Sequence, residues 1–343
     1  MGGRSSEHEV SIDSARSVVE GLNPERYDVI PIEIPRHGPS LLAAELAGAD
    51  VVFPVLHGPF GEDGTVQGLL ELADVAYVGA GVTASALAMD KDLFKSVLRD
   101  KGIPVARSIA LRPGDAPTAP FGFPCVVKPA RLGSSVGISI VGSEPDFPAA
   151  VELAFAHDEK ILVEEFLDGI EVECSVLGNL EPIASVPGEI VPLASDWYDY
   201  EAKYADGGME LVVPARISAE AAGRVQELAV AAFVASDCEG MARVDFFVRP
   251  GGEVVVNELN TIPGFTATSV YAKLFEESGL PYPELLDRLV ELALQRYERR
   301  ASLHPAVFEP PHQLLGVVAR DVRPLNPLRL RLPRRDEQHV AVA

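Results

Sequence analysis

Two carboxylates on a predicted β-hairpin are the first candidates for chemistry. The segment 241–260 contains two β-rich runs separated by the turn Pro250-Gly251-Gly252. With the turn centred between its two glycines, antiparallel pairing places Asp245 opposite Glu258. Opposed carboxylates have Cβ atoms only about 5 Å apart and repel each other, so they destabilise a sheet. A divalent cation removes that conflict, because carboxylate oxygens are suitable ligands for Mg²⁺.

Two further polar residues follow from the same register. Arg243 lies opposite Asn260, and period-2 alternation puts both side chains on the face that carries the carboxylates. An amide oxygen is another ligand that Mg²⁺ accepts, and substrate phosphates usually complete its coordination. Ordinary solvated residues on an exposed sheet face are an equally open interpretation of these four side chains.

A lysine followed by a flexible loop is the second candidate. In Lys128-Pro-Ala-Arg-Leu-Gly-Ser-Ser-Val-Gly137, an apolar strand ends on a lysine and leads into backbone N–H groups and hydroxyls that can fold over phosphates. The run is not a Walker A motif, since its lysine precedes the glycines. Taken alone, it is better explained as a plain hairpin loop between two strands.

Two strand ends are weaker candidates. Val163-Glu-Glu-Phe-Leu167 ends in a turn whose backbone N–H and C=O groups can read adenine. His57 begins the run His57-Gly-Pro-Phe-Gly-Glu-Asp-Gly64, which follows a predicted parallel strand, and ligands bind at the carboxyl ends of such strands. A plain strand end and a structural histidine are the competing interpretations. Together with the hairpin and the loop, however, these segments describe a magnesium-nucleotide site.

The elements that must position these residues follow an α/β pattern. In the first third of the chain helices and strands alternate, which predicts a parallel sheet with helices on its faces. The helices are expected at 10–22, 41–47 and 65–73, and the strands at 27–34 and 50–56. A smaller unit follows, with a helix at 84–101, strands at 125–128, 138–141 and 161–165, and a helix at 146–156. A third region contains a long polar loop at 194–209, a helix at 219–236, the hairpin and a helix at 283–299.

The two ends of the chain do not fit this pattern. Met1-Gly2-Gly3 has the form of a turn that follows a strand, so we expect the first sheet to lack its central first strand and to have two exposed strand edges. Residues 301–343 are rich in proline and have no sustained periodicity. We therefore expect a poorly ordered tail that contributes no core.

Composition excludes several functional classes. A chain of 343 residues fits two or three domains. It contains no apolar run of the ~20 residues that a membrane helix needs and no basic and apolar leader, so we expect a cytoplasmic protein with no membrane partner. A formal net charge of −22 argues against a nucleic-acid partner. The three cysteines lack metal-site or disulfide spacing and are expected to be buried free thiols.

Seven segments, in this order, resemble the D-alanine-D-alanine ligase family of ATP-grasp carboxylate-amine ligases. The similarity spans about residues 2 to 299. The segments are Gly2 to Ser11, His57 to Gly68, Met89 to Lys91, Lys128 to Gly137, Tyr198 to Tyr204, Arg243 to Asp245 and Asn257 to Gly264. The family pattern has a strand of the type V-A-V-L-F directly before Gly2-Gly3.

The resemblance implies an α/β, three-domain ATP-grasp fold whose N-terminal sheet is Rossmann-like and parallel. The implied units are a substrate-binding domain at 1–82, a central ATP-grasp domain at 83–173 and a C-terminal catalytic domain at 174–300, followed by the tail at 301–343. The implied partners are small molecules, D-alanine and ATP. The sequence leaves open whether the chain forms a homodimer.

The resemblance also implies roles for individual residues. For ATP they are Lys91, Lys128 and Ser135 at the phosphates, Glu164, Glu165, Phe166 and Leu167 at adenine, and Glu171 at the ribose. Two Mg²⁺ or Mn²⁺ ions would be held by Asp245, Glu258 and Asn260. Glu7 and His57 would lie at the first D-alanine, and Ser134 and Tyr204 would close the long loop. Arg243 and the Gly264 N–H would stabilise the oxyanion of the tetrahedral intermediate. Lys203 and Ser269 would hold the carboxylate of the second D-alanine.

The implied reaction forms an acyl phosphate from the first D-alanine and then a peptide bond with the second. Tyr204, and the absence of histidine between His157 and His304, favour D-alanine over D-lactate as the second substrate. A D-alanine-D-serine ligase and another ATP-grasp ligase are open alternatives within the fold. A nucleotide-binding regulatory protein without catalysis is the alternative from another class.

Overall fold

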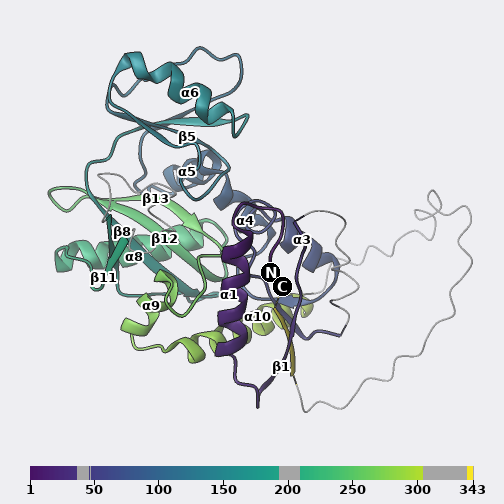
Figure 1. Cartoon of the computed structure of the whole chain (residues 1–343). Helices are drawn as coiled ribbons and strands as arrows, with labels where there is room; N and C mark the ends of the chain where they lie inside the picture. The colour runs from purple at the N-terminus through teal and green to yellow at the C-terminus, as the bar shows by residue number, and fades with distance from the viewer. Residues whose placement is uncertain (37–45, 47, 193–208, 304–337, 343) are drawn as a thin grey trace, which may run out of the picture.

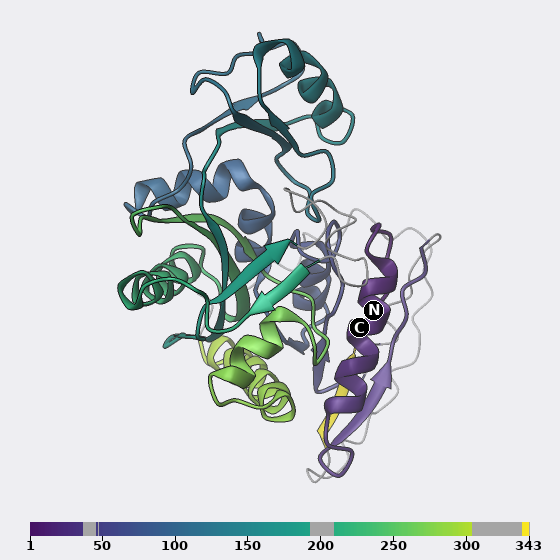
Figure 2. The same cartoon turned by 60° about the vertical axis from the view of Figure 1, so that its left-hand side comes forward.

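Three sheets, each with its own helices, make up this computed structural model (Figure 1). The structure describes residues 1–36, 46, 48–192, 209–303 and 338–342. The unit around β5 projects from one end of the molecule, and the other two units pack against each other below it (Figures 1 and 2). Most of the predicted helix at 41–47 and most of the long loop at 194–209 lie outside the described residues.

The first sheet is parallel, with strand order β1-β14-β2-β3. Its strands are β1 (Tyr27–Pro31), β14 (Gln338–Val342), β2 (Val51–Phe53) and β3 (Ala76–Tyr77). The helices beside it are α1 (His8–Gly21), α3 (Thr65–Leu72) and α10 (Tyr282–Ala301). Helix α1 buries residues at the three- and four-residue spacing of one helical face, from His8 to Val18. The α/β order predicted for this region is therefore confirmed.

The two expectations for the chain ends need correction. Residues 338–342, predicted to belong to a poorly ordered tail, form β14 in the centre of the first sheet. Because β14 is hydrogen-bonded to β1 on one side and β2 on the other, the expected gap between exposed edges is filled. Local periodicity could not reveal this, since the pairing joins segments more than 280 residues apart in sequence.

The second unit is an antiparallel sheet with strand order β4-β7-β5-β6. Its elements are α4 (Val82–Met89), α5 (Lys91–Asp100), β4 (Ser108–Leu111), β5 (Cys125–Pro129), β6 (Ser139–Val141), η1 (Glu144–Asp146), α6 (Phe147–Phe155) and β7 (Ile161–Glu165). The single helix predicted at 84–101 is divided at Asp90, whose backbone is extended and whose carboxylate caps α5 by accepting from Leu93 N. The break makes Lys91 the first residue of α5.

The third unit is built on a sheet with strand order β11-β10-β8-β12-β13. Its elements are β8 (Ile170–Gly178), β9 (Ile183–Ala184), β10 (Gly188–Pro192), β11 (Met209–Val212), α8 (Ala219–Ala235), β12 (Gly240–Val248), β13 (Val254–Asn260) and α9 (Val270–Glu277). Helix α8 packs on one face, and Tyr271 and Phe275 of α9 join a core shared with α10 and the first sheet. That shared core fixes the first unit against the third.

Two further sequence expectations can be compared with the structure. Cys125, Cys174 and Cys238 are buried free thiols, as predicted. Burial raises the pKa of the Cys174 thiol to about 12. Across the described ranges, no helix has both the length and the apolar character needed to cross a bilayer.

Candidate active site

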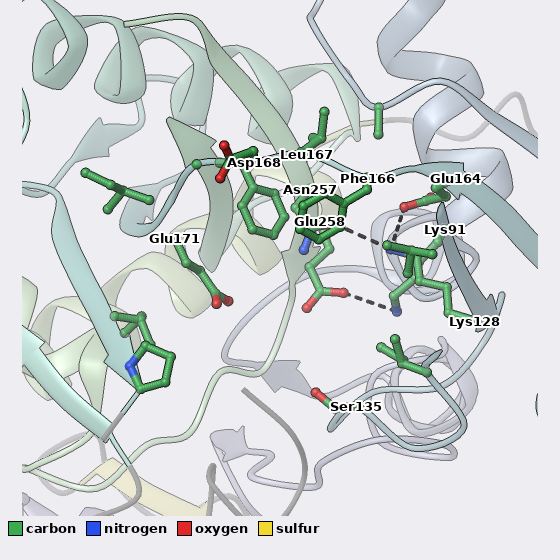
Figure 3. Close-up of a pocket in the computed structure, with 18 of the residues that line it drawn as sticks. Lys91, Lys128, Ser135, Glu164, Phe166, Leu167, Asp168, Glu171, Asn257 and Glu258 are labelled. Carbon is green, nitrogen blue, oxygen red and sulfur yellow. Dashed lines mark hydrogen bonds and ion pairs between the residues drawn. The ribbon is translucent and has the colours of Figure 1, made fainter. Parts of the chain in front are cut away.

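A cavity of about 410 Å³ lies where the second and third units meet (Figure 3). Its walls come from β5, β7 and α5 on one side and from β8, β10 and β13 on the other. The predicted nucleotide residues line it: Lys91, Lys128, Ser135, Glu164, Glu165, Phe166, Leu167 and Glu171. Segments separated by up to 167 residues in sequence, from Lys91 to Glu258, therefore meet around one space.

The hairpin register predicted for the carboxylates is confirmed. Asp245 lies opposite Glu258, and Arg243 opposite Asn260. The register shifts by one residue between Asp245 and Phe246, so the pairs nearer the turn differ from those of a regular hairpin. The bulged residue is Asn257, which lines the first cavity next to Glu258, and the predicted pairs at Asp245 and Arg243 stay in place.

Arg243 neutralises this carboxylate group in the described structure. Its guanidinium donates two hydrogen bonds of 2.7 Å to Asp245 and forms a 2.9 Å ion pair with Glu173. Burial opposes a charge on Arg243, but Asp245 and Glu173 hold the pKa of the guanidinium well above its usual range. Asn260 Nδ2 donates to Asp245 at 2.9 Å. The arginine is therefore positioned as a fixed positive charge.

Three buried lysines lie at one end of the cavity: Lys91 and Lys128 line it, and Lys95 lies behind them. Lys128 pairs with Glu164 at 2.9 Å, and Lys95 pairs with the same carboxylate at 3.1 Å. Burial opposes ionisation of Glu164, yet the two lysines hold its pKa below the usual range. Lys91 donates to Leu132 O at 2.8 Å and lies 3.3 Å from Glu258. Because one carboxylate is shared by two lysines, the group around Glu164 keeps a net positive charge.

The other end of the cavity is more apolar. Phe166 and Leu167 follow β7 and form its wall, with Glu171 facing the same space (Figure 3). Glu165 accepts hydrogen bonds from Arg107 N and Nε, each at 2.8 Å, so its carboxylate anchors the strand entering this segment. The Glu164 carboxylate is engaged by Lys95 and Lys128.

A second cavity of about 340 Å³ adjoins the first and is lined by the predicted amino-acid residues. The residues predicted for substrate or oxyanion that line it are Glu7, His57, Ser134, Arg243, Gly264 and Ser269. Ser134 donates to Glu7 at 2.6 Å, which joins the loop between β5 and β6 to the first unit. Gly58 lies so close to Glu7 that a Cβ there would come within 2.5 Å of the carboxylate, so only glycine fits.

His57 is held in one tautomer by two hydrogen bonds. Its Nδ1–H donates to Ile262 O at 2.9 Å, so Nε2 accepts from the Ser14 hydroxyl at 3.0 Å. Burial lowers the pKa of the imidazole, which keeps it neutral near pH 7. His57 therefore ties the first unit to the segment that follows β13.

Ser269 and Gly264 form the far wall of the second cavity. Ser269 precedes α9 at its N-cap, and its hydroxyl oxygen accepts from Thr266 N at 3.0 Å. Gly264 lies beside it, with a hypothetical Cβ 3.4 Å from the Ser269 hydroxyl oxygen. Lys203 and Tyr204, predicted to complete this end, lie outside the described residues.

The two cavities share Gly133, Ser134 and Glu258 in their walls. A phosphate bound near the lysines and a carboxylate bound near Glu7 would therefore meet at the same place. The arrangement suits transfer of a phosphoryl group from the first cavity to an acid in the second, because proximity is the main requirement of that reaction.

Sequence reasoning missed three residues of this region. Glu173 lies opposite Asp245 on β8, Lys95 lies on the buried face of α5, and Glu62 accepts from Gly58 N at 2.7 Å and Ile262 N at 3.1 Å. The four-residue spacing of Lys91 and Lys95 was a usable signal, since it places both on one helical face. No local pattern identifies the strand that pairs with β12.

Glu62 gives the ligand-free protein a testable pH dependence. Burial, assisted by the charge of Glu7, raises the pKa of Glu62 from 4.5 to about 8. Unfolding thus releases a proton between these pH values, so the stability that Glu62 contributes below pH 4.5 is lost as the pH rises through about 8. Its share of the slope is up to about 1.4 kcal/mol per pH unit.

Urea unfolding at pH 5, 6.5 and 8 measures this slope in the wild type and in Glu62→Gln. The variant is expected to lose less unfolding free energy between pH 5 and pH 8. The control Glu152→Gln, on the exposed side of α6, should behave as the wild type. Identical slopes for the wild type and Glu62→Gln would contradict the assignment.

The three units and the paired cavities define an ATP-grasp ligase. The profile of the D-ala D-ala ligase C-terminus matches residues 97–291, and that of the D-ala D-ala ligase N-terminus matches 1–46 and 39–80. A D-alanine-D-alanine ligase from Solibacter usitatus is 48% identical over 310 residues, covering 87% of this chain and 95% of the relative. The chain therefore belongs to the D-alanine-D-alanine ligase family.

Solved structures agree with this classification. The structure of a D-Ala:D-Ser ligase from Enterococcus faecalis matches with a TM-score of 0.77 at 39% identity, covering 85% of this chain and 97% of that one. A D-alanine-D-alanine ligase from Bacillus anthracis complexed with ATP matches with a TM-score of 0.75 at 30% identity, covering 88% and 97%. The expected fold class is confirmed.

Proposed function

We propose that this enzyme uses ATP to join two D-alanine molecules into D-alanyl-D-alanine, releasing ADP and phosphate, for peptidoglycan synthesis. The observation that carries the proposal is the common wall of the two cavities at Gly133, Ser134 and Glu258. The relatives named D-alanine-D-alanine ligase, at 41 to 48% identity, support the substrate. The D-serine alternative is not favoured by these curated relatives.

The first step needs a carboxylate beside the γ-phosphate. The carboxylate oxygen of the first D-alanine attacks the γ-phosphorus, the bond to the bridging oxygen breaks, and ADP leaves. Glu7 would hold the ammonium of this D-alanine, and its hydrogen bond with Ser134 would bring the loop at 133–137 over the phosphates. Lys91 and Lys128 would balance the charge of the transferring group.

The second step makes the peptide bond. The amine of the second D-alanine attacks the acyl carbon and loses a proton, and the tetrahedral intermediate expels phosphate. Arg243, already fixed by Asp245 and Glu173, would stabilise the oxyanion together with the Gly264 N–H. Ser269 and Lys203 would hold the carboxylate of this substrate. Tyr204 would join Glu7 and Ser134 in closing the site against water.

The side chains of the carboxylate hairpin have the donor chemistry that magnesium and manganese prefer. Asp245 and Glu258 offer hard oxygen ligands on opposed strands, and Asn260 adds an amide group beside them. When bound, two such ions would neutralise the triphosphate and polarise the transferring phosphoryl group. In the structure, Arg243 and Lys91 supply the positive charge at these carboxylates.

The organisation of the chain is part of the proposal. We assign substrate binding to residues 1–82, the nucleotide cover to 83–173 and catalysis to 174–300. Most strands of each sheet lie in one of these ranges, but β14 joins the first sheet from residues 338–342, and β8 begins at Ile170. We place the reaction in the cytoplasm, where ATP is available, and keep a homodimer as an assembly to be tested by light scattering.

The function is tested by ADP release with D-alanine, D-serine, D-lactate and L-alanine as substrates. We expect turnover with D-alanine, a dipeptide as product, and little D-alanyl-D-lactate at pH 7 when D-alanine and D-lactate are equally concentrated. D-serine is the demanding competitor, because a hydrophobic pocket rejects an added hydroxyl only about 10²-fold. Predominant D-alanyl-D-lactate or D-alanyl-D-serine would overturn the substrate assignment and leave the fold unaffected.

The ATP assignment of the first cavity predicts the effect of Lys128→Met. The variant is expected to raise the KM for ATP about 10- to 100-fold, since a charge-assisted hydrogen bond to phosphate contributes roughly 1.5–3 kcal/mol. Lys95 remains to neutralise Glu164, so the fold should survive. The control Lys101→Met removes an exposed lysine and should leave KM unchanged. A lower melting temperature with an unchanged KM would support a purely structural lysine.

A further inference from the structure

The C-terminal strand β14 connects β1 to the rest of the molecule. It pairs in parallel with β1 from Tyr27↔Gln338 to Pro31↔Val342, and with β2 from Val51↔Val340 to Phe53↔Val342. Among the described strands, β14 is the only neighbour of β1 in the sheet. In Figures 1 and 2 the yellow strand lies directly beside β1 in both views. The profile of the N-terminal domain does not include these residues.

The first residues of the chain continue the same ladder along the segment that follows β1. Ile34 N donates to Met1 O and Gly3 N donates to Ile34 O, both at 2.8 Å, so Gly2 lies opposite Ile34. The Met1 amino group donates to Ile32 O at 2.9 Å, which is the preceding rung. This is the alternating bonding of a parallel pair.

The registers of these two pairings agree. Val342 lies opposite Pro31 at the end of β1, and Gly2 lies opposite Ile34, three residues further along the chain. If the chain is numbered as though Met1 followed Ala343, Gly2 is also three residues after Val342. The two chain ends therefore occupy one strand position without a shift.

The Met1 amino group takes the place of a backbone amide in this strand. Burial lowers its pKa from 8.0 to about 5, although the nearby Glu33 carboxylate opposes the shift. The amine is therefore uncharged near pH 7 and donates to Ile32 O as an amide would. A neutral donor avoids the cost of placing an ammonium inside a sheet.

The strand position is bonded directly to the helix that carries the first-substrate residue. Gly2 N donates to the Ser11 hydroxyl at 2.7 Å, and the imidazole Nδ1 of His8 lies 2.7 Å from Gly3 O. Both partners belong to the first turns of α1, and Glu7 immediately precedes that helix. A Cβ on Gly2 would lie 2.6 Å from Ile34 O, so the two backbones are too close for a side chain at this position. Displacement of the strand would thus move Glu7.

We infer that residues 338–342 and Met1 to Gly3 act as one split strand, which positions α1 and thereby holds Glu7 at the second cavity. The order of the two halves along the chain should then not matter. A protein with residues 338–343 joined directly ahead of Met1 should form the same sheet and hold Glu7 in the same place. Residues 304–337 would serve only as a connection. A connection of that length can reach about 110 Å when extended, so it does not limit the docking of β14.

Two full-length variants test whether β14 positions the site. Val340→Pro removes a ladder donor from a strand with partners on both sides, and Ala319→Pro is its control within the connection. Val340→Pro is expected to lower the melting temperature by about 5 °C or more and to raise the KM for D-alanine at the first subsite at least fivefold, with the KM for ATP unchanged. Ala319→Pro should match the wild type. Unchanged values for Val340→Pro would overturn the inference.

A transposition tests the split strand itself. Deletion of 338–343 is compared with a variant in which the same six residues precede Met1 and the chain ends at 337. The deletion should lower the melting temperature and the yield of folded protein, and the transposed chain should recover the wild-type melting temperature within a few degrees and kcat/KM within about threefold. A control deletion of 320–325 should have no effect. Failure of the transposed chain to recover would overturn the inference.

The two readouts separate this inference from the proposed function on which the role of Glu7 rests. The melting temperature reports the strand whether or not the protein ligates D-alanine. If the transposed chain regains the wild-type melting temperature but neither it nor the wild type ligates D-alanine, only the substrate assignment is contradicted. A deletion with unchanged stability would contradict the strand alone.

Discussion

Glu258→Gln is expected to reduce the turnover of ligation at least a hundredfold while the protein stays folded. Glutamine keeps the shape of the side chain but removes a negative charge that would balance a divalent cation at the triphosphate. Without ligands, the same change relieves repulsion with Asp245 on the opposed strand. Lys91 loses its 3.3 Å ion pair but keeps its hydrogen bond to Leu132 O. Loss of activity with an unchanged or higher melting temperature is therefore the expected result.

The measurement is ADP release at saturating ATP and D-alanine over a range of Mg²⁺ concentrations, together with thermal unfolding. The KM for Mg²⁺ should rise in Glu258→Gln, so excess metal should restore part of the turnover. Glu253→Gln is the matched control, since Glu253 is exposed near the turn of the same hairpin and pairs only with Arg249 in the described structure. Wild-type turnover of Glu258→Gln at low Mg²⁺ would refute the metal assignment.

Arg243→Met is expected to affect both turnover and stability. Removing an oxyanion donor typically reduces kcat about 10²- to 10³-fold. Removing the guanidinium also leaves Asp245 and Glu173 as neighbouring buried carboxylates, and breaking a buried ion pair costs roughly 3–5 kcal/mol. Arg243→Lys should recover much of the stability through its charge, but it cannot keep the paired hydrogen bonds to Asp245 and should turn over slowly.

A double variant separates the two effects. Adding Glu173→Gln to Arg243→Met removes one of the two buried carboxylate charges that Arg243 no longer neutralises. Part of the lost unfolding free energy should return, while kcat stays low. Arg249→Met, at the exposed end of the hairpin, is the control and should match the wild type in both measurements. Wild-type kcat in Arg243→Lys would show that the guanidinium does not act on the reaction. Recovery of kcat in the double variant would also contradict the oxyanion role.

The candidate site was predictable to the extent that its geometry is local. A turn centred between Gly251 and Gly252 and period-2 alternation predicted Asp245 opposite Glu258 without a structure. The observed turn is centred on Gly251, and the bulge after Asp245 restores the predicted pair. The bulge after Asp245 was not predictable, because no residue in that run marks it. Lys91 and Lys95 could be placed on one helical face, but the break at Asp90 needed the cap geometry.

Other parts of the site depend on contacts between distant segments. The pairing of Glu173 with Asp245, and the placement of Lys128 near Asn257, require the order of strands and the approach of two units. Side-chain types on β8 do not reveal which strand will be its neighbour. The neutral tautomer of His57 and the raised pKa of Glu62 likewise follow from burial between units.

The amino-acid sequence by itself determined the α/β class, the hairpin register and the family, because these rest on short-range periodicity, turn residues and motifs read along the chain. Only the tertiary structure decided that residues 338–342 fill the sheet position next to β1 and β2. A short apolar run such as Val340 to Val342 can pair with any open edge. Residues 338–342 pair between β1 and β2 because that position is open in the folded sheet, and the position exists only once the sheet has formed.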